Sequence, residues 1–196
     1  MFDIFERYIL SQITLTPDEL QFMRSLSTSR KMRRRQFLLR EGEVARHKIF
    51  VCQGLVRNYH RGDDGTEYIM RFAAENTWTT DHESYFNQTP SKSNIDALED
   101  TTIVLWTKEN FNELSEGIPA LKSYLVHVMT SSMDAALNRV MSNISYTNEE
   151  KYQDFVNSFP DVFQRVPLHM VASYLGVSRE TLSRIRQAQV KQQKGY

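Results

Sequence analysis

The sequence predicts an α+β protein in three parts: a sandwich or roll of short strands, a long helix, and a C-terminal pair of short helices. Three observations support this prediction. Glycine-containing turns separate short apolar segments between about residues 30 and 107. A stretch without glycine or proline follows from residue 120 to residue 146. Two short segments with helical apolar spacing then meet at Gly176.

Two short helices are predicted before the strands. Residues 2–10 carry apolar side chains at helical spacing. Thr16 stands three residues before Glu19, which is the spacing of a capping box at the start of a second helix. That helix is expected to end in the polar run 25–29. The basic run 30–35 is interpreted as a solvated face, since it is remote in sequence from the C-terminal helix pair.

Short strands are expected in the middle of the chain. The predicted strands are residues 36–40, 47–52, 54–60, 66–73 and 101–107. Four of the seven glycines occupy the turns between them: Gly42, Gly54, Gly62 and Gly65. Residues 78–96 have weak periodicity and are predicted to form a loop with a short helix. The large aromatic side chains here fit a pocket or a packed core equally well: Trp78, Tyr85, Phe86 and Trp106.

The long helix is predicted at residues 120–146, after a short helix that ends before Pro119. One stripe of this helix carries Leu121, Leu125, Val128, Met129, Ser132, Ala136, Val140 and Ile144. The stripe is expected to face a second copy of the chain, and the alternative is that it packs only on the chain's own strands. A further helix is predicted at 148–158, with a stop at Pro160.

Composition limits the class of protein. Basic and acidic residues balance at 24 each, but the basic residues gather at the C-terminus. Residues 165–196 contain Arg165, Arg179, Arg184, Arg186, Lys191 and Lys194 against the single acid Glu180. This asymmetry is typical of a DNA-reading tail. The lone Cys52 and the scattered histidines predict no metal site and no cofactor. Without a membrane span or signal peptide, the expected location is the cytoplasm.

The C-terminal pair has the pattern of a helix-turn-helix. Apolar residues that would pack its two helices together are Val171, Leu175, Val177, Leu182 and Ile185. Ala172 is small at the close approach, Gly176 suits a left-handed turn, and Ser178 suits the N-cap of the second helix. The remaining side chains are types that contact bases and phosphates: Arg179, Glu180, Thr181, Ser183, Arg184 and Arg186. An ordinary helical hairpin with a solvated face is the alternative.

The segment Ser178-Arg-Glu-Thr-Leu-Ser-Arg184 resembles the recognition helix of the Crp/Fnr family of bacterial regulators. The resemblance extends to Glu41-Gly-Glu43 and Gly54-Leu-Val-Arg57. It implies a cyclic-nucleotide-binding-like sensor domain at 1–116, a dimerisation helix at 117–146 and a helix-turn-helix domain at 147–196. The implied folds are a jelly-roll-like double-stranded β-helix and a winged-helix-like domain. Arg179, Glu180 and Arg184 would read bases, while Ser178, Thr181 and Ser183 would contact phosphate.

Two departures from this family pattern alter the expectation. Residues 79–94 contain no Gly-Glu pair and no arginine, which relatives use to hold a cyclic phosphate. Lys92 could replace the arginine only as a point charge, so no response to cyclic AMP is expected. The connection from Pro160 to Pro167 is also too short for the β-hairpin wing of many relatives.

The sequence therefore predicts a homodimeric transcription regulator that binds a palindromic site in double-stranded DNA. The second copy would bind through helix 120–146. The resemblance also allows RNA polymerase and an unidentified small-molecule effector as partners. No membrane is expected to be a partner. The alternative is a small-molecule sensor that acts through protein contacts without binding DNA. An enzyme is not expected, because the strands lack clustered histidine and carboxylate ligands.

Overall fold

The structure, a computed structural model, describes residues 1–193 and the side chains of residues 1–189. The helices are α1 (Phe2–Gln12), α2 (Pro17–Ser25), α3 (His82–Asn87), α4 (Lys108–Gly117), α5 (Pro119–Ser145), α6 (Asn148–Ser158), α7 (Pro160–Arg165), α8 (Leu168–Leu175) and α9 (Arg179–Gln193). The strands are β1 (Thr28–Met32), β2 (Phe37–Leu39), β3 (His47–Gln53), β4 (Val56–Arg61), β5 (Glu67–Ala73), β6 (Thr77–Thr79), β7 (Asn94–Ala97) and β8 (Thr101–Thr107).

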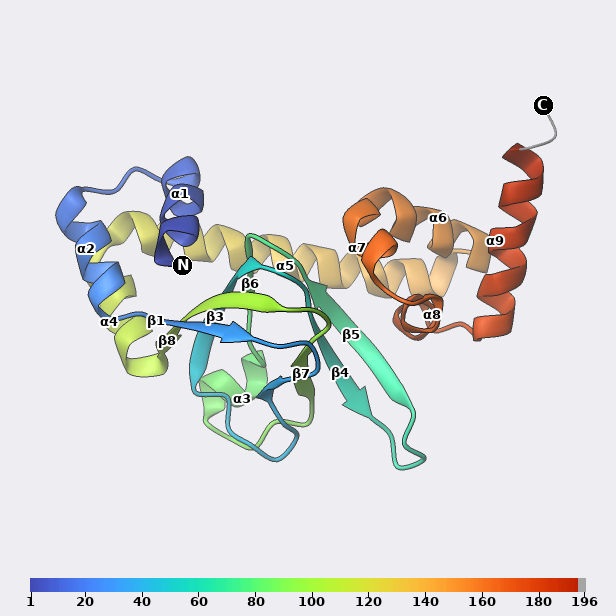
Figure 1. Cartoon of the computed structure of the whole chain (residues 1–196), viewed down its shortest axis with the longest axis horizontal. Coiled ribbons are helices and arrows are strands. Elements are labelled where there is room, and N and C mark those ends of the chain that lie inside the picture. Colours follow the sequence, from blue (N-terminus) through green and yellow to red (C-terminus); the bar gives the residue numbers. More distant parts are fainter. Residues whose placement is uncertain (194–196) are drawn as a thin grey trace.

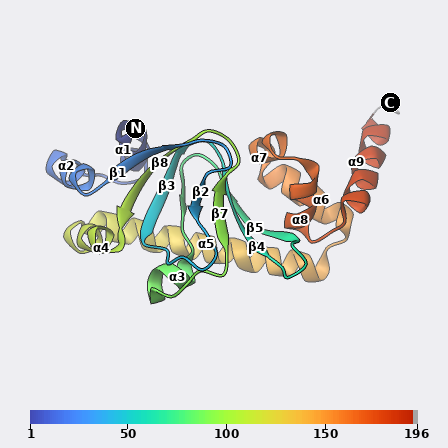
Figure 2. The same cartoon turned by 60° about the horizontal axis from the view of Figure 1, so that its bottom comes forward.

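The strands form two antiparallel four-stranded sheets, with the orders β1-β8-β3-β6 and β2-β7-β4-β5. They make the β-roll at the centre of the molecule (Figure 1). Helices α1, α2 and α4 lie at one end of the roll and α6 to α9 at the other, while α5 runs along the whole assembly (Figure 2). The predicted α+β class and β-roll are confirmed.

Strand β3 shows how the sequence determines the two faces of the first sheet. Its side chains alternate, because successive residues of a strand point to opposite faces. Ile49 and Val51 enter the core between the sheets, whereas Phe50 and Cys52 enter the core beneath the helices. Both faces are covered, so the strand is a continuous apolar run rather than a polar–apolar alternation.

The core beneath the helices is aromatic. Phe5 makes edge-on contacts with Phe50, Trp78 and Trp106, at ring separations between 4.9 and 5.6 Å. Trp106 is fully buried, and its indole N–H donates to the Met23 carbonyl at 3.0 Å. Trp106 is therefore a core residue. The apolar surface of α1, α2 and α4 is covered by this cluster, which attaches these helices to the roll.

The structure adds elements that the sequence did not predict. The polar run 25–29 and the basic run 30–35 were expected outside the strands, but Thr28–Met32 forms β1 and pairs with β8. Residues 78–96 do contain the predicted short helix, α3, together with parts of two strands, β6 and β7. Pro160 does not end the helical region, because it occupies the first turn of α7, where proline is tolerated.

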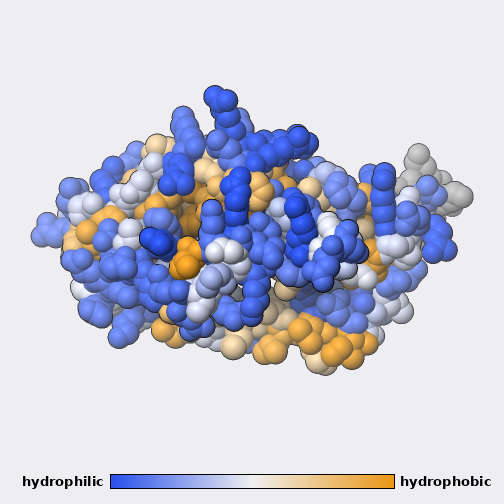
Figure 3. Space-filling model, turned by 90° about the horizontal axis from the view of Figure 1, so that it is seen from below, coloured by the Kyte–Doolittle hydropathy of each residue, from blue (hydrophilic) through white to orange (hydrophobic). Residues whose placement is uncertain are grey.

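Helix α5 has two different halves. Its first half packs on the roll, where Leu121 is buried and Leu125 and Val128 are partly buried. Its second half leaves apolar side chains in solvent: Met133, Leu137, Val140, Met141 and Ile144 are each 54–76% exposed. Apolar groups gather accordingly at the edge of the molecule where α5 runs (Figure 3). The predicted single stripe was thus wrong in part: its first residues face the chain's own roll.

The C-terminal part is helical over its described residues. Helix α6 begins with the capping box of Thr147 and Glu150 and spans the predicted residues 148–158. No strand occurs between residues 147 and 193, so the hairpin wing is absent there, as the short connection predicted. The winged-helix likeness is therefore limited to its helices.

Candidate nucleic-acid interface and effector cavity

The turn between α8 and α9 has the backbone that Gly176 was predicted to supply. Gly176 lies in the left-handed region, at φ +69°, directly after Leu175. The next amide, that of Val177, donates back to the Ala172 carbonyl at 3.1 Å. A non-glycine residue would be strained at this φ, so glycine permits the sharp change of direction between the two helices.

Ser178 caps α9. Its hydroxyl oxygen accepts a hydrogen bond from the Thr181 amide at 3.1 Å, and its O–H donates to the Thr181 hydroxyl at 3.0 Å. These two bonds fix the first turn of α9. The Ser178 hydroxyl is thereby engaged within the protein, whereas the Thr181 hydroxyl keeps its own proton available for an acceptor.

The packing face of the pair consists of the residues predicted for it. Val171, Ala172, Leu175, Leu182 and Ile185 are buried together, and Val177 is partly buried against them. The opposite face of α9 is formed by Glu180, Arg184 and Gln187, which are exposed. Their spacing of four and then three residues places them on one ridge of the helix. Sequence reasoning missed Gln187, although its helical spacing from Arg184 could have indicated it.

Arg179 and Arg186 flank this ridge, and Ser183 is partly buried beside it. Arg179 also lines a cleft between α8 and the hairpin of β4 and β5, together with Thr66, Tyr68 and His169. Arg165 was counted among the basic residues of the tail, yet it is not free to meet DNA. Its guanidinium group pairs with Glu75 at 2.8 Å and also with Glu99, both of the roll.

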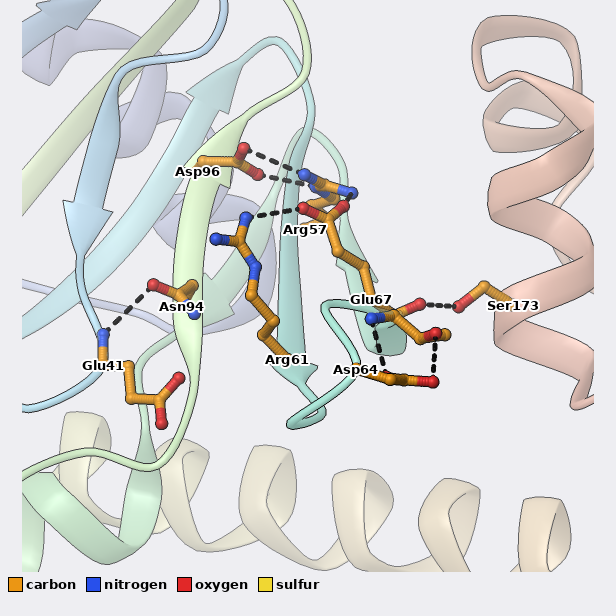
Figure 4. Close-up of polar contacts among 9 residues, drawn as sticks. Glu41, Arg57, Arg61, Asp64, Glu67, Asn94, Asp96 and Ser173 are labelled. Atoms are coloured by element: carbon orange, nitrogen blue, oxygen red, sulfur yellow. Dashed lines mark hydrogen bonds and ion pairs between the residues drawn. The ribbon is translucent and has the colours of Figure 1, made fainter.

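Helix α8 docks directly on β5 of the roll. The Ser173 hydroxyl donates to the Glu67 carbonyl at 2.6 Å (Figure 4). It also accepts from the Ile69 amide at 2.9 Å. Arg139 of α5 joins the same place, since its guanidinium donates to the carbonyls of Ile69 at 3.1 Å and Tyr174 at 2.7 Å. Helices α5 and α8 therefore meet on one short segment of β5.

The roll holds a buried ion-pair network beside this contact. Arg57 is 7% exposed and donates to both oxygens of Asp96, at 2.8 and 3.2 Å (Figure 4). It also pairs with Glu67, which Arg61 reaches at 3.0 Å. Burial raises the pKa of Glu67, but hydrogen bonds from Arg57 and Arg61 outweigh burial and keep that pKa below its usual value. The buried Arg57 is fully matched by carboxylates.

A cavity of about 200 Å³ lies between the roll and the first half of α5. Its lining residues include Trp78, Tyr85 and Phe86, so these aromatic residues border a pocket as well as the core. Lys48 and Arg71 line it too. The walls of the cavity therefore come from both the roll and α5.

The region that would hold a cyclic phosphate is occupied differently. The Asp81 carboxylate accepts from the Ser84 amide at 3.1 Å and from the hydroxyls of Ser91 and Ser93 at 2.5 and 2.9 Å. A carboxylate thus already fills the start of α3. Lys92 lies on the surface and pairs with Glu83 at 3.2 Å, away from the cavity lining.

Comparisons with known proteins agree with this architecture. Residues 29–117 match the family model of the cyclic nucleotide-binding domain. No curated protein sequence matches the chain.

Across residues 1–193, no helix combines the length and the apolar character needed to cross a membrane. Over the same residues, no three His, Cys, Asp or Glu side chains are grouped as a metal site would require.

Three solved structures illustrate the likeness. FixK2 from Bradyrhizobium japonicum is 18% identical with a TM-score of 0.73, and the match covers 85% of each chain. The c-di-GMP-responsive global regulator CLP from Xanthomonas campestris is 13% identical with a TM-score of 0.74, over 90% of this chain and 93% of CLP. The catabolite activator protein of Thermus thermophilus is 19% identical with a TM-score of 0.55, over 91% of this chain and 85% of that one.

The chain is therefore similar to the cyclic nucleotide-binding domain over residues 29–117. Its overall fold is shared with these regulators, so the predicted resemblance to the Crp/Fnr family is confirmed at the level of the fold.

Proposed function

We propose that this protein is a transcription regulator that binds a palindromic DNA site as a homodimer. The observation that carries the proposal is the pair α8–α9, with its left-handed Gly176 and an exposed ridge of Glu180, Arg184 and Gln187. A capped helix with such a ridge fits the major groove. Residues 147–196 would be the DNA-binding domain in this scheme, after a sensor domain at 1–116 and a dimerisation helix at 117–146.

The proposed contacts divide into two groups. Arg179, Glu180 and Arg184 would contact base edges, with Gln187 added because it continues their ridge. Ser178, Thr181, Ser183 and Arg186 would contact phosphate groups. Among the hydroxyls, Thr181 is the best suited, since the Ser178 O–H is already donated within the cap.

The exposed half of α5 supports a dimer. Its apolar side chains from Met133 to Ile144 follow one helical face and are each more than half exposed. A second copy related by a two-fold axis would bury this face and place two α9 helices about one DNA turn apart.

Effector control is supported by the position of β5. Arg71 of β5 lines the cavity, while Ile69 and Glu67 of the same strand hold α8. A ligand that shifts β5 or α5 would alter how the DNA-binding helices are held. The fold shared with CLP, a c-di-GMP-responsive regulator, also supports an effector. We also propose RNA polymerase as a further partner and the cytoplasm as the location of the protein.

The test is selection of bound sites from random DNA by the purified full-length chain. A two-fold symmetric consensus is expected, with binding that weakens as salt concentration rises. Absence of any salt-dependent DNA binding would favour the alternative function, a sensor that acts through protein contacts alone. Analytical ultracentrifugation of Leu137→Glu, with exposed Gln153→Glu as the control, tests the dimer separately.

A further inference from the structure

We propose that the cavity between the roll and α5 binds a small organic anion with an apolar or aromatic body, whose charged group lies between Lys48 and Arg71. This inference deepens the proposed function, because it names the chemical class of the effector. It rests on an excess of positive charge, an unpaired buried hydroxyl and an apolar wall, all within one cavity.

The charge in the cavity is one-sided. Its lining contains Lys48, Arg71, His82 and Lys122 but no aspartate or glutamate. Lys48 and Arg71 are partly buried, and neither has an ion pair or a side-chain hydrogen bond with the described part of the chain. Cations removed from water are normally paired, since their desolvation is otherwise uncompensated. A bound anion would supply the missing partner.

The pKa shifts agree with this geometry. Burial, together with the nearby charge of Arg71, lowers the pKa of Lys48 to about 8. Lys48 therefore still carries its proton at pH 7. Desolvation of the ring and the charges of Lys48 and Arg71 lower the pKa of His82 to about 4, so His82 is neutral and adds no positive charge.

Tyr85 supplies an independent observation. It lines the same cavity and is 2% exposed, and its buried hydroxyl group has no hydrogen-bond partner among the side chains and backbone that the structure describes. A buried hydroxyl that lacks a partner is uncommon in a folded protein. Burial raises the pKa of Tyr85 to about 12, so the group remains a donor at neutral pH. A carboxylate oxygen of the ligand would accept a hydrogen bond from this hydroxyl group.

The rest of the lining determines the body of the ligand. Apolar and aromatic side chains predominate: Trp78, Phe86, Phe111, Leu125, Val128 and Met129. The volume of about 200 Å³ is below the roughly 300–1,000 Å³ of sites for drug-sized ligands. A small aromatic or branched carboxylate fits these limits. The phosphate of a cyclic nucleotide could not bind at the start of α3, because the Asp81 carboxylate already occupies that position.

The experiment titrates full-length protein with benzoate, salicylate and 4-phenylbutyrate, and with neutral benzamide. The readouts are tryptophan fluorescence, to which Trp78 and Trp106 both contribute, and the thermal midpoint. The variants are Lys48→Met and Arg71→Met. At least one carboxylate is expected to bind and to raise the midpoint, while benzamide has no effect. Each variant should weaken carboxylate binding by about tenfold or more, because a charge-assisted hydrogen bond is lost. Lys92→Met, at the surface, should leave the affinity unchanged within about twofold.

Arg71→Lys keeps the charge and should retain binding, which separates loss of charge from loss of fold. The inference is overturned if no carboxylate binds, if benzamide binds equally well, or if both methionine variants bind like the wild type. Cyclic AMP binding that is insensitive to Lys48→Met also overturns it. DNA binding is measured on the same preparations. If the protein binds DNA but no carboxylate, this inference alone is rejected. If it binds a carboxylate but no DNA, the proposed function alone is rejected.

Discussion

The roll contains two sets of partly or fully buried cations that differ in their partners. Arg57, on the side of the roll that faces α8, is matched by Asp96 and Glu67. Lys48 and Arg71, on the side that faces α5, have no carboxylate among the residues that line their cavity. Arg57 is buried and Lys48 and Arg71 are partly buried, but only Arg57 is paired with carboxylates in the described part of the chain.

This difference separates a structural role from a binding role. A paired buried charge orders the fold around it, and its removal leaves the partner uncompensated. An unpaired cation destabilises the folded protein slightly, but it is available to bind an anionic ligand. The same contrast applies to the C-terminal part, where Arg165 is paired with the roll but Arg184 has no ion pair within residues 1–193.

The largest effect is expected from Arg57→Met. The substitution leaves the Asp96 carboxylate, which is 6% exposed, buried without its cation. It should lower the free energy of unfolding by about 3–5 kcal/mol, as breaking one side of a buried pair does. Urea denaturation followed by circular dichroism measures this. Arg61→Met, at the exposed end of the network, is the control and should cost less than about 1 kcal/mol.

Arg184→Ala tests an unpaired cation on α9. It should cost about 1–3 kcal/mol of binding to the selected site and relax discrimination at one base position. Arg186→Ala, which flanks the ridge, should instead weaken cognate and random DNA equally and reduce the salt dependence. Fluorescence anisotropy at several salt concentrations distinguishes the two patterns. Equal weakening of both DNAs by Arg184→Ala would contradict its assignment as a base reader.

Local patterns made much of the fold predictable. The capping box at Thr16, the turn at Gly176 and the N-cap at Ser178 all depend on neighbours within a few residues. Strand β1 was missed because its burial pattern is largely exposed and only Met32 is buried, so no alternation marks it. Its pairing partner, β8, is about seventy residues away in the sequence.

The candidate sites were predictable to different degrees. The ridge of α9 follows from helical spacing, so the sequence alone could nominate its residues. The cavity cannot be predicted in this way, because its polar lining residues come together from distant positions on β3, β5, α3 and α5. The stripe on α5 shows the same limit. Leu121 and Ile144 look equivalent by periodicity, and only the tertiary fold decides that one faces the roll and the other faces solvent.

Arg165→Ala tests the paired cation that joins α7 to the roll. Because Glu75 and Glu99 are partly exposed, the expected loss of stability is only about 1 kcal/mol. The local effect should be larger: amide hydrogen exchange in α7 and α8 should accelerate. Arg24→Ala, which breaks an exposed pair with Asp3 and Glu6 at the other end of the molecule, is the control and should leave that exchange unchanged.

The smallest effect, and the only one of opposite sign, is expected from Lys48→Met in the absence of ligand. The folded protein holds the pKa of Lys48 at about 8, below its ordinary value of 10.5, so the unfolded chain binds more protons between these two values. Wild-type stability should therefore rise from pH 8 toward pH 10.5, and the variant should lack this rise. At pH 7 the variant should be more stable by no more than about 1 kcal/mol, since solvent screens a partly buried ammonium group. Urea denaturation between pH 7 and pH 10 measures the difference, with Lys92→Met as the surface control. A loss of stability as large as that of Arg57→Met would place Lys48 among the structural cations, and the distinction between the two sides of the roll would then fail.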